Sequence, residues 1–102
     1  MYYKVTARLM EGKGSELFGR IQDGSIASQE PDGQEIVAAM KRAVVKDTGE
    51  IEWSETCYCN SPLAHERKTV LDHYFTGIET EIVDGYQQHQ GSPFTDHLAN
   101  LA

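Results

Sequence analysis

The sequence predicts a single α+β domain in which short antiparallel strands are combined with two amphipathic helices. Three observations predict this class. The chain has 102 residues, which is the size of one domain. Several short runs alternate apolar and polar residues, as half-buried strands do. Two further segments carry their apolar residues at helical spacing. The expected order is strand, helix, strand, strand, helix, strand and a short C-terminal helix.

The first strand and the first helix follow directly from spacing. Every second residue of 2–9 is apolar, which predicts a strand with one buried face. That face carries Tyr3, Val5, Ala7 and Leu9. Glycines then interrupt the alternation, and Ser15 can cap a helix that ends near Gly24. The apolar stripe of this helix consists of Leu17, Phe18 and Ile21.

A hairpin is predicted in the middle of the chain, after a loop that contains Pro31, Asp32 and Gly33. Residues 35–46 are rich in Val and Ile without clean alternation, which indicates a strand with a bulge or a strand covered on both faces. Residues 47–49, Asp-Thr-Gly, form the expected tight turn. Residues 50–59 form the partner strand.

The second helix is expected to begin at Ser61 as the N-cap and Pro62 as the first helical residue. Its inward stripe consists of Leu63, Val70, Leu71 and Tyr74, and its outward face of His65, Glu66, Lys68, Asp72 and His73. After Gly77, residues 78–83 predict the last strand. Ser92-Pro93 opens a short helix that presents Phe94, Leu98 and Leu101.

Two interleaved right-handed β-α-β crossovers predict a four-stranded antiparallel sheet with both main helices on one face. This element order resembles the ferredoxin-like βαββαβ sandwich, including the dimeric α/β-barrel proteins, over residues 1 to about 83. We accordingly expect a ferredoxin-like α+β domain at 1–84 and a C-terminal tail with a short helix at 85–102. The resemblance implies a fold and a tendency to form homodimers. Function does not travel with this superfold.

Charge and hydropathy exclude several classes of function. The formal net charge is −7, and no Lys or Arg follows Lys68. Nucleic acid and anionic membrane surfaces bind clustered basic residues, so we expect neither as a partner. No apolar run approaches the roughly 20 residues that cross a bilayer. The beginning of the chain resembles a strand rather than a secretion signal, and two cysteines give no disulfide framework, so we expect a cytoplasmic protein.

Cys57 and Cys59 are the most conspicuous local feature. On a strand both thiols would project to the same side, and His65 follows a few residues later. Two thiols and an imidazole could hold a soft metal ion, but a structural zinc site takes four ligands and no fourth is apparent. We therefore expect both cysteines to pack in the core, with no cofactor, and keep them as weak candidates for metal ligands.

His65, His73 and Glu55 are the candidate catalytic residues. Imidazoles titrate near neutral pH, but a general base also needs a substrate proton within reach. Alternation places Glu55 on the apolar face beside Trp53, where an unpaired carboxylate would be costly or would stay neutral.

Two functions remain open. The first is a homodimeric binding or interaction module without catalytic activity, since no complete catalytic set is present. The second is a cofactor-independent enzyme or small-ligand carrier resembling the dimeric α/β-barrel proteins, with Trp53 and Tyr58 lining a ligand pocket. A cavity with converging polar groups would favour the second.

Overall fold

The computed structural model describes residues 1–101. The strands are β1 Tyr2–Leu9, β2 Val44–Val45, β3 Ile51–Thr56, β4 Phe75–Val83 and β5 Ser92–Pro93. The helices are α1 Gly14–Gln22, α2 Gly33–Arg42, α3 Ala64–Glu66, the π-helical turn η1 Arg67–Leu71, α4 Asp72–Tyr74 and α5 Phe94–Leu101. All strand pairs are antiparallel, in the order β4-β1-β3-β2-β5. The predicted α+β class is confirmed, with five strands in the sheet instead of four.

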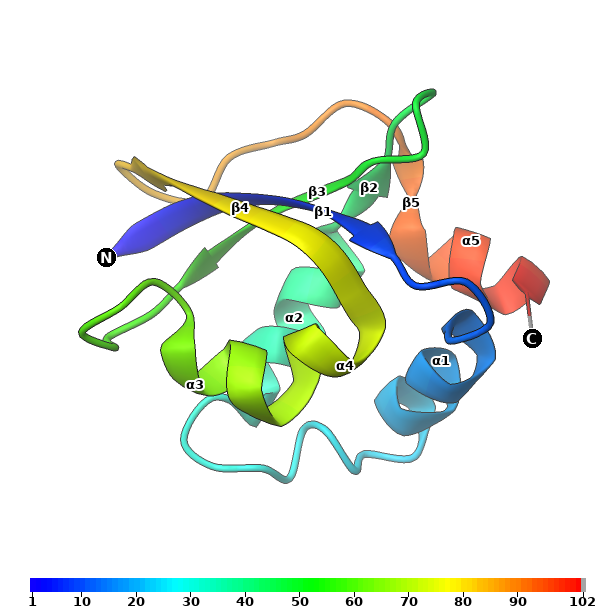
Figure 1. Ribbon diagram of the computed structural model, residues 1–102, viewed down its shortest axis with the longest axis horizontal. Helices are drawn as coiled ribbons and strands as arrows, with labels where there is room; N and C mark the ends of the chain where they lie inside the picture. Colours follow the sequence, from blue (N-terminus) through cyan, green and yellow to red (C-terminus); the bar gives the residue numbers. More distant parts are fainter. Residues whose placement is uncertain (102) are drawn as a thin grey trace.

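One sheet separates two layers of unequal thickness. Helices α1, α2 and the continuous segment α3-η1-α4 lie on one side, and α5 lies beside β5 at the edge (Figure 1). Residues 84–91, which we call the strap, connect β4 to β5 across the opposite side of the sheet (Figure 1). Strand β3 is consequently buried on both faces from Ile51 to Glu55.

The prediction of a strand over residues 35–46 is wrong for most of that range. Residues 33–42 form α2, and only Val44 and Val45 form a strand. The buried residues Ile36, Val37 and Met40 are three and four positions apart, which is the period of a helix. Two β-branched pairs, one in the helix and one in the strand, made the segment resemble a single β run. Packing of a helical stripe on the core outweighed that propensity.

The predicted hairpin is nevertheless present in shortened form. Val44 pairs with Glu52 and Val45 with Ile51, and the backbone N–H of Lys46 donates to the carbonyl of Glu50. Gly49 has a φ of 88°, which the tight turn requires and which favours glycine. Strand β3 ends at Thr56, so Cys57 to Cys59 belong to the turn that follows the strand.

The segment after β3 starts its helix later than the sequence predicts. Ser61 and Pro62 precede a residue in the left-handed region, Leu63 at φ 57°, and helical structure begins at Ala64. The predicted inward stripe is confirmed, since Leu63, Val70, Leu71 and Tyr74 are all buried. Glu66, expected to face water, is 2% exposed. The prediction for Glu66 is wrong because the left-handed conformation of Leu63 changes which side of the following helix is directed toward the core.

Two other elements also begin at residues that differ from the predicted ones. Helix α1 starts at Gly14, so Ser15 lies inside it and is not its N-cap. Strand β4 begins at Phe75 and runs through Gly77, whose φ of 61° accompanies a break in register opposite β1 between Thr6 and Arg8. Gly77 therefore marks a β-bulge rather than the start of the strand.

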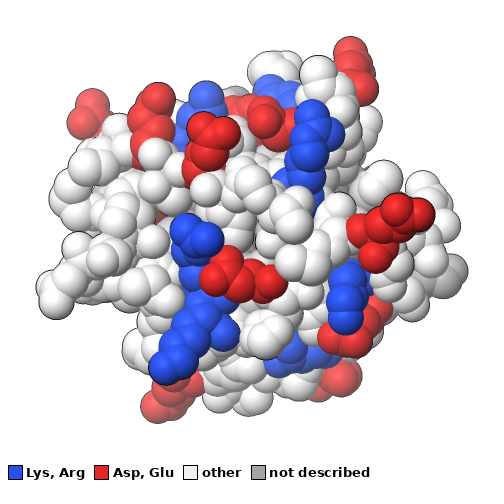
Figure 2. Space-filling model, viewed as in Figure 1, with Lys and Arg blue, Asp and Glu red and all other residues white. Residues whose placement is uncertain are grey.

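The C-terminal helix packs on its own chain. Phe94 and Leu98 are fully buried, and α5 lies against α1 and α2, whereas Leu101 is 51% exposed. The helix therefore does not require a partner molecule to cover its apolar stripe. Among residues 1–101, no helix has the length and apolarity to cross a membrane. Acidic and basic side chains are interspersed over the face in Figure 2, without a large field of either sign.

Candidate functional site

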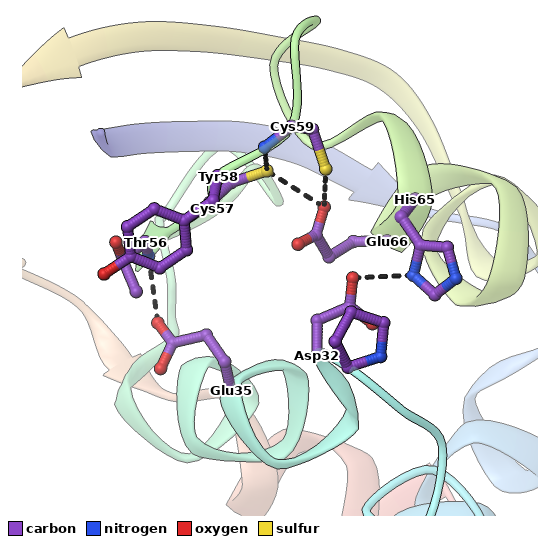
Figure 3. A pocket seen from close by; sticks show the side chains of 9 residues that line it. Asp32, Glu35, Thr56, Cys57, Tyr58, Cys59, His65 and Glu66 are labelled. Carbon is purple, nitrogen blue, oxygen red and sulfur yellow. Dashed lines mark hydrogen bonds and ion pairs between the residues drawn. The ribbon is translucent and has the colours of Figure 1, made fainter.

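A pocket of about 260 Å³ opens between the start of α2, the turn after β3 and the start of α3. Figure 3 shows its side chains converging from these three elements. The pocket is lined by Pro31, Asp32, Glu35, Thr56, Cys57, Tyr58, Cys59, His65 and Glu66. Three of these residues carry carboxyl groups and two carry thiols. No Lys or Arg is among them.

Two thiols and one carboxyl group form the inner end of the pocket. Glu66 Oε2 lies 3.4 Å from Cys57 Sγ and 3.8 Å from Cys59 Sγ, and both thiols donate to it (Figure 3). The backbone N–H of Cys59 donates to Cys57 Sγ at 3.2 Å. Cys57 is buried, Cys59 is half-buried, and neither is in a disulfide. The turn after β3 and the start of α3 thus bring a thiol pair onto a buried carboxyl group.

Burial disfavours the charged forms of Cys57 and Glu66. Burial raises the pKa of the Cys57 thiol to about 12. The pKa of Glu66 is also raised, first by burial and further by the neighbouring Asp32 carboxyl group. A reactive thiolate needs a lowered pKa. Cys57 is therefore unsuited to act as a nucleophile.

A second polar pair forms the outer wall. His65 Nδ1 and Asp32 Oδ2 lie 2.7 Å apart, which fixes the imidazole at the pocket (Figure 3). Asp32 Oδ1 is buried and has no hydrogen-bond partner. A buried carboxylate oxygen without a partner is rare and needs an explanation in a folded protein. It leaves one acceptor beside the pocket unsatisfied.

The third carboxyl group, that of Glu35, links the pocket to the strap. Its Oε2 accepts the backbone N–H of Thr56 at 2.9 Å and forms an ion pair with Arg42 at 3.0 Å. The hydroxyl of Tyr86, in the strap, donates to the same carboxylate. Arg42 in turn lies 4.2 Å from the centroid of the Tyr86 ring.

Glu55 and Trp53 lie behind the pocket, in the core. Both are fully buried, and Trp53 Nε1 donates to Glu55 Oε1 at 2.6 Å. Burial is the main reason that the pKa of Glu55 is raised to about 8. Oxygen Oε2 of Glu55 has no hydrogen-bond partner. Glu55 is therefore a neutral carboxylic acid in the core at pH 7.

A further hydrogen-bonded chain lies on the other face of the sheet. Ser54 Oγ is 2.6 Å from His89 Nε2, and His89 Nδ1 is 2.9 Å from Glu52 Oε1. These contacts have the order of a serine–histidine–carboxylate triad. Ser54 is fully buried, however, and the Gln87 backbone N–H already donates to its hydroxyl. A substrate cannot reach Ser54, so the chain fastens the strap to the sheet.

The structure brings four of the sequence-predicted site residues into one pocket, namely Tyr58, Cys57, Cys59 and His65. It does not bring the others there. Trp53 and Glu55 lie in the core, and His73 is exposed on α4 beside Tyr74. Sequence analysis missed Asp32, Glu35 and Glu66 as pocket residues. The Pro-Asp-Gly signal at 31–33 located the loop but not its contact with His65.

The chain was compared with protein-family models, with curated proteins and with solved structures, and none of them matches.

Proposed function

We propose that this chain is a binding module whose pocket takes a small cation. One observation carries the proposal: the carboxyl groups of Asp32, Glu35 and Glu66 converge with two thiols on a pocket that no Lys or Arg side chain lines. A concave site in which carboxyl groups outnumber basic side chains concentrates a negative potential. An anionic ligand would be repelled there.

The size of the pocket limits the cation. Its volume of about 260 Å³ lies just below the range of roughly 300–1,000 Å³ that is usual for drug-sized ligands. A metal ion with its remaining waters, or an ammonium group on a short chain, fits this space. Tyr58 is 91% exposed at the mouth, where its ring is free to pack on a cation.

Two features support a binding role over catalysis. Cys57 has a raised pKa, contrary to what a nucleophile requires. The serine–histidine–carboxylate chain lies under the strap, away from the pocket.

The strand order supports an extended form of the ferredoxin-like arrangement. Strand β1 lies between β4 and β3, and strand β3 lies between β1 and β2. Homodimerisation stays a prediction. The apolar residues Phe94 and Leu98 of α5 are covered by their own chain, so they do not require a second copy.

The test is a titration of the reduced, untagged protein followed by backbone amide NMR. The probes are Zn²⁺, Mg²⁺ and n-butylammonium, with butyrate as the anionic counterpart of the last. We expect at least one cation to shift the amide signals of Tyr58, Cys59 and His65, and butyrate to leave them unchanged. Asp32→Asn should weaken cation binding about tenfold, since it removes a charge-assisted contact. Glu79→Gln, on the exposed face of β4, is the matched control.

The proposal is wrong if no cation shifts these signals. It is also wrong if butyrate shifts them as strongly as n-butylammonium does, because the carboxyl groups would then not select the charge of the ligand.

A further inference from the structure

The inner end of the pocket holds three atoms of the kinds that bind transition metals. Cys57 Sγ, Cys59 Sγ and a carboxylate oxygen of Glu66 all lie within 4.8 Å of one another. Thiolate sulfur and carboxylate oxygen are both common zinc ligands. The identity of this cation extends the proposed function and therefore rests on it.

The spacing of these atoms agrees with tetrahedral coordination. With Zn–S near 2.3 Å and Zn–O near 2.1 Å, a tetrahedral angle separates sulfur and oxygen by about 3.6 Å. The two sulfur–oxygen distances are 3.4 and 3.8 Å. Two sulfurs on one zinc are about 3.8 Å apart, so the upper limit of 4.8 Å leaves at most about 1 Å to close.

Two backbone segments, the turn after β3 and the start of α3, hold these three atoms in position. Cys57 directly follows the last residue of β3, and Glu66 lies in the first turn of α3. The N–H of Cys59 points at Cys57 Sγ, where it would stabilise negative charge on a thiolate. Leu63, fully buried with φ 57°, holds the start of α3 against this turn. The turn and the helix thus present their ligand atoms to one point.

We propose that Cys57, Cys59 and Glu66 bind one borderline-soft divalent metal ion of the Zn²⁺ type, with the fourth position open to the pocket. Asp32 supplies an independent observation in favour of this arrangement. Its buried Oδ1, in the same pocket as Glu66, has no partner within hydrogen-bond distance, and a water or other ligand in the fourth position would satisfy it. Three protein ligands with one open position distinguish this site from a closed structural zinc site.

The chemistry of the ligand atoms selects among cations. Two thiols favour Zn²⁺ over Mg²⁺ and Ca²⁺, which prefer an all-oxygen environment. A disulfide between Cys57 and Cys59 is the competing use of the same sulfur atoms, and it would abolish metal binding.

The test is a competition titration of reduced, untagged, chelator-treated protein with Zn²⁺ against a chromophoric chelator. Co²⁺ serves as the spectroscopic probe, since tetrahedral thiolate-bound Co²⁺ has strong visible and charge-transfer bands. We expect one Zn²⁺ per chain and little response to Mg²⁺. Cys59→Ser should weaken Zn²⁺ binding more than about 100-fold, since removing even an outer-shell partner costs roughly 10–100-fold.

The variants separate ligation from folding. Cys57 is buried and its substitution can harm the fold, so the half-buried Cys59 and the variant Glu66→Gln carry the test, each checked by amide dispersion. Glu79→Gln should bind Zn²⁺ like the unsubstituted chain. Equal Zn²⁺ affinity in Cys59→Ser and the unsubstituted chain would overturn the inference.

Failure of this inference can be told from failure of the proposed function. If n-butylammonium or Mg²⁺ occupies the pocket and Zn²⁺ binds no better than Mg²⁺, the metal site is wrong while the cation pocket stands. If no cation occupies the pocket, both are wrong. Loss of both free thiols under reducing conditions would also overturn the metal site, because it would show a disulfide in its place.

Discussion

Replacing Glu55 with Gln should remove a large pH dependence from the stability of this protein. The pKa of Glu55 is raised from 4.5 to about 8 in the folded chain, chiefly by burial. Between these values the folded state holds a proton that the unfolded state releases. The free energy of unfolding therefore falls by about 1.4 kcal/mol per pH unit as the pH rises through this window.

The magnitude follows from the width of the window. From pH 4.5 to about 8 the loss sums to about 5 kcal/mol, at the order-of-magnitude level. This is a large share of the roughly 5–15 kcal/mol that stabilises a small domain. In Glu55→Gln the amide is neutral at every pH, and its oxygen can still accept the N–H of Trp53. The variant and the unsubstituted chain should thus be similar near pH 4.5, and the variant more stable at pH 8.5.

The assay is urea unfolding from pH 4.5 to 9 in the presence of a chelator. The fluorescence of Trp53, the single tryptophan, and far-UV circular dichroism provide two probes. Glu79→Gln, exposed on β4, should shift the profile by less than about 0.5 kcal/mol. If the profiles of Glu55→Gln and the unsubstituted chain run parallel across the window, Glu55 is ionised in the fold and the reasoning is refuted.

Two further perturbations test the fold around the site. His89→Ala removes the imidazole that both Ser54 and Glu52 contact. We expect the free energy of unfolding to fall by about 2 kcal/mol and amide hydrogen exchange in the strap to become faster. Unchanged exchange at Gln87, whose N–H donates to Ser54, would show that other contacts hold the strap. Gly33→Ala would place a Cβ against the carbonyl oxygen of Ile26, so we expect the free energy of unfolding, measured by urea titration, to fall by at least about 2 kcal/mol. A decrease below about 0.5 kcal/mol would show that the loop before α2 shifts to accommodate the methyl group.

Local patterns predicted those elements whose apolar residues recur at the regular spacing of one strand or one helix. The alternation of residues 2–9 gave β1, and the stripe ending at Tyr74 gave the buried face of the second helical segment. Helix α2 was missed because Ile36 and Val37 favour strands locally, while only contact with the sheet decides in favour of a helix. Propensity is a weak guide where tertiary packing opposes it.

The candidate site was predictable only along a short stretch of chain. Cys57, Tyr58, Cys59 and His65 lie within nine residues and stood out as a group. Asp32 meets His65 from 33 residues away, through a helix that the sequence did not predict. Glu66 was placed on the outer face by an unbroken 3.6-residue period, which the left-handed Leu63 and the π-helical turn η1 both violate.

The double-sided burial of β3 constrains how this sequence can change over evolution. A strand with one wet face tolerates exchange at every second position, whereas Ile51 to Glu55 offer no such position. Five successive residues, apolar and charged alike, are each held by neighbours from different layers. Homologues of this chain should therefore keep the Ile-Glu-Trp-Ser-Glu segment unchanged, while the less buried positions of β1 accept substitutions.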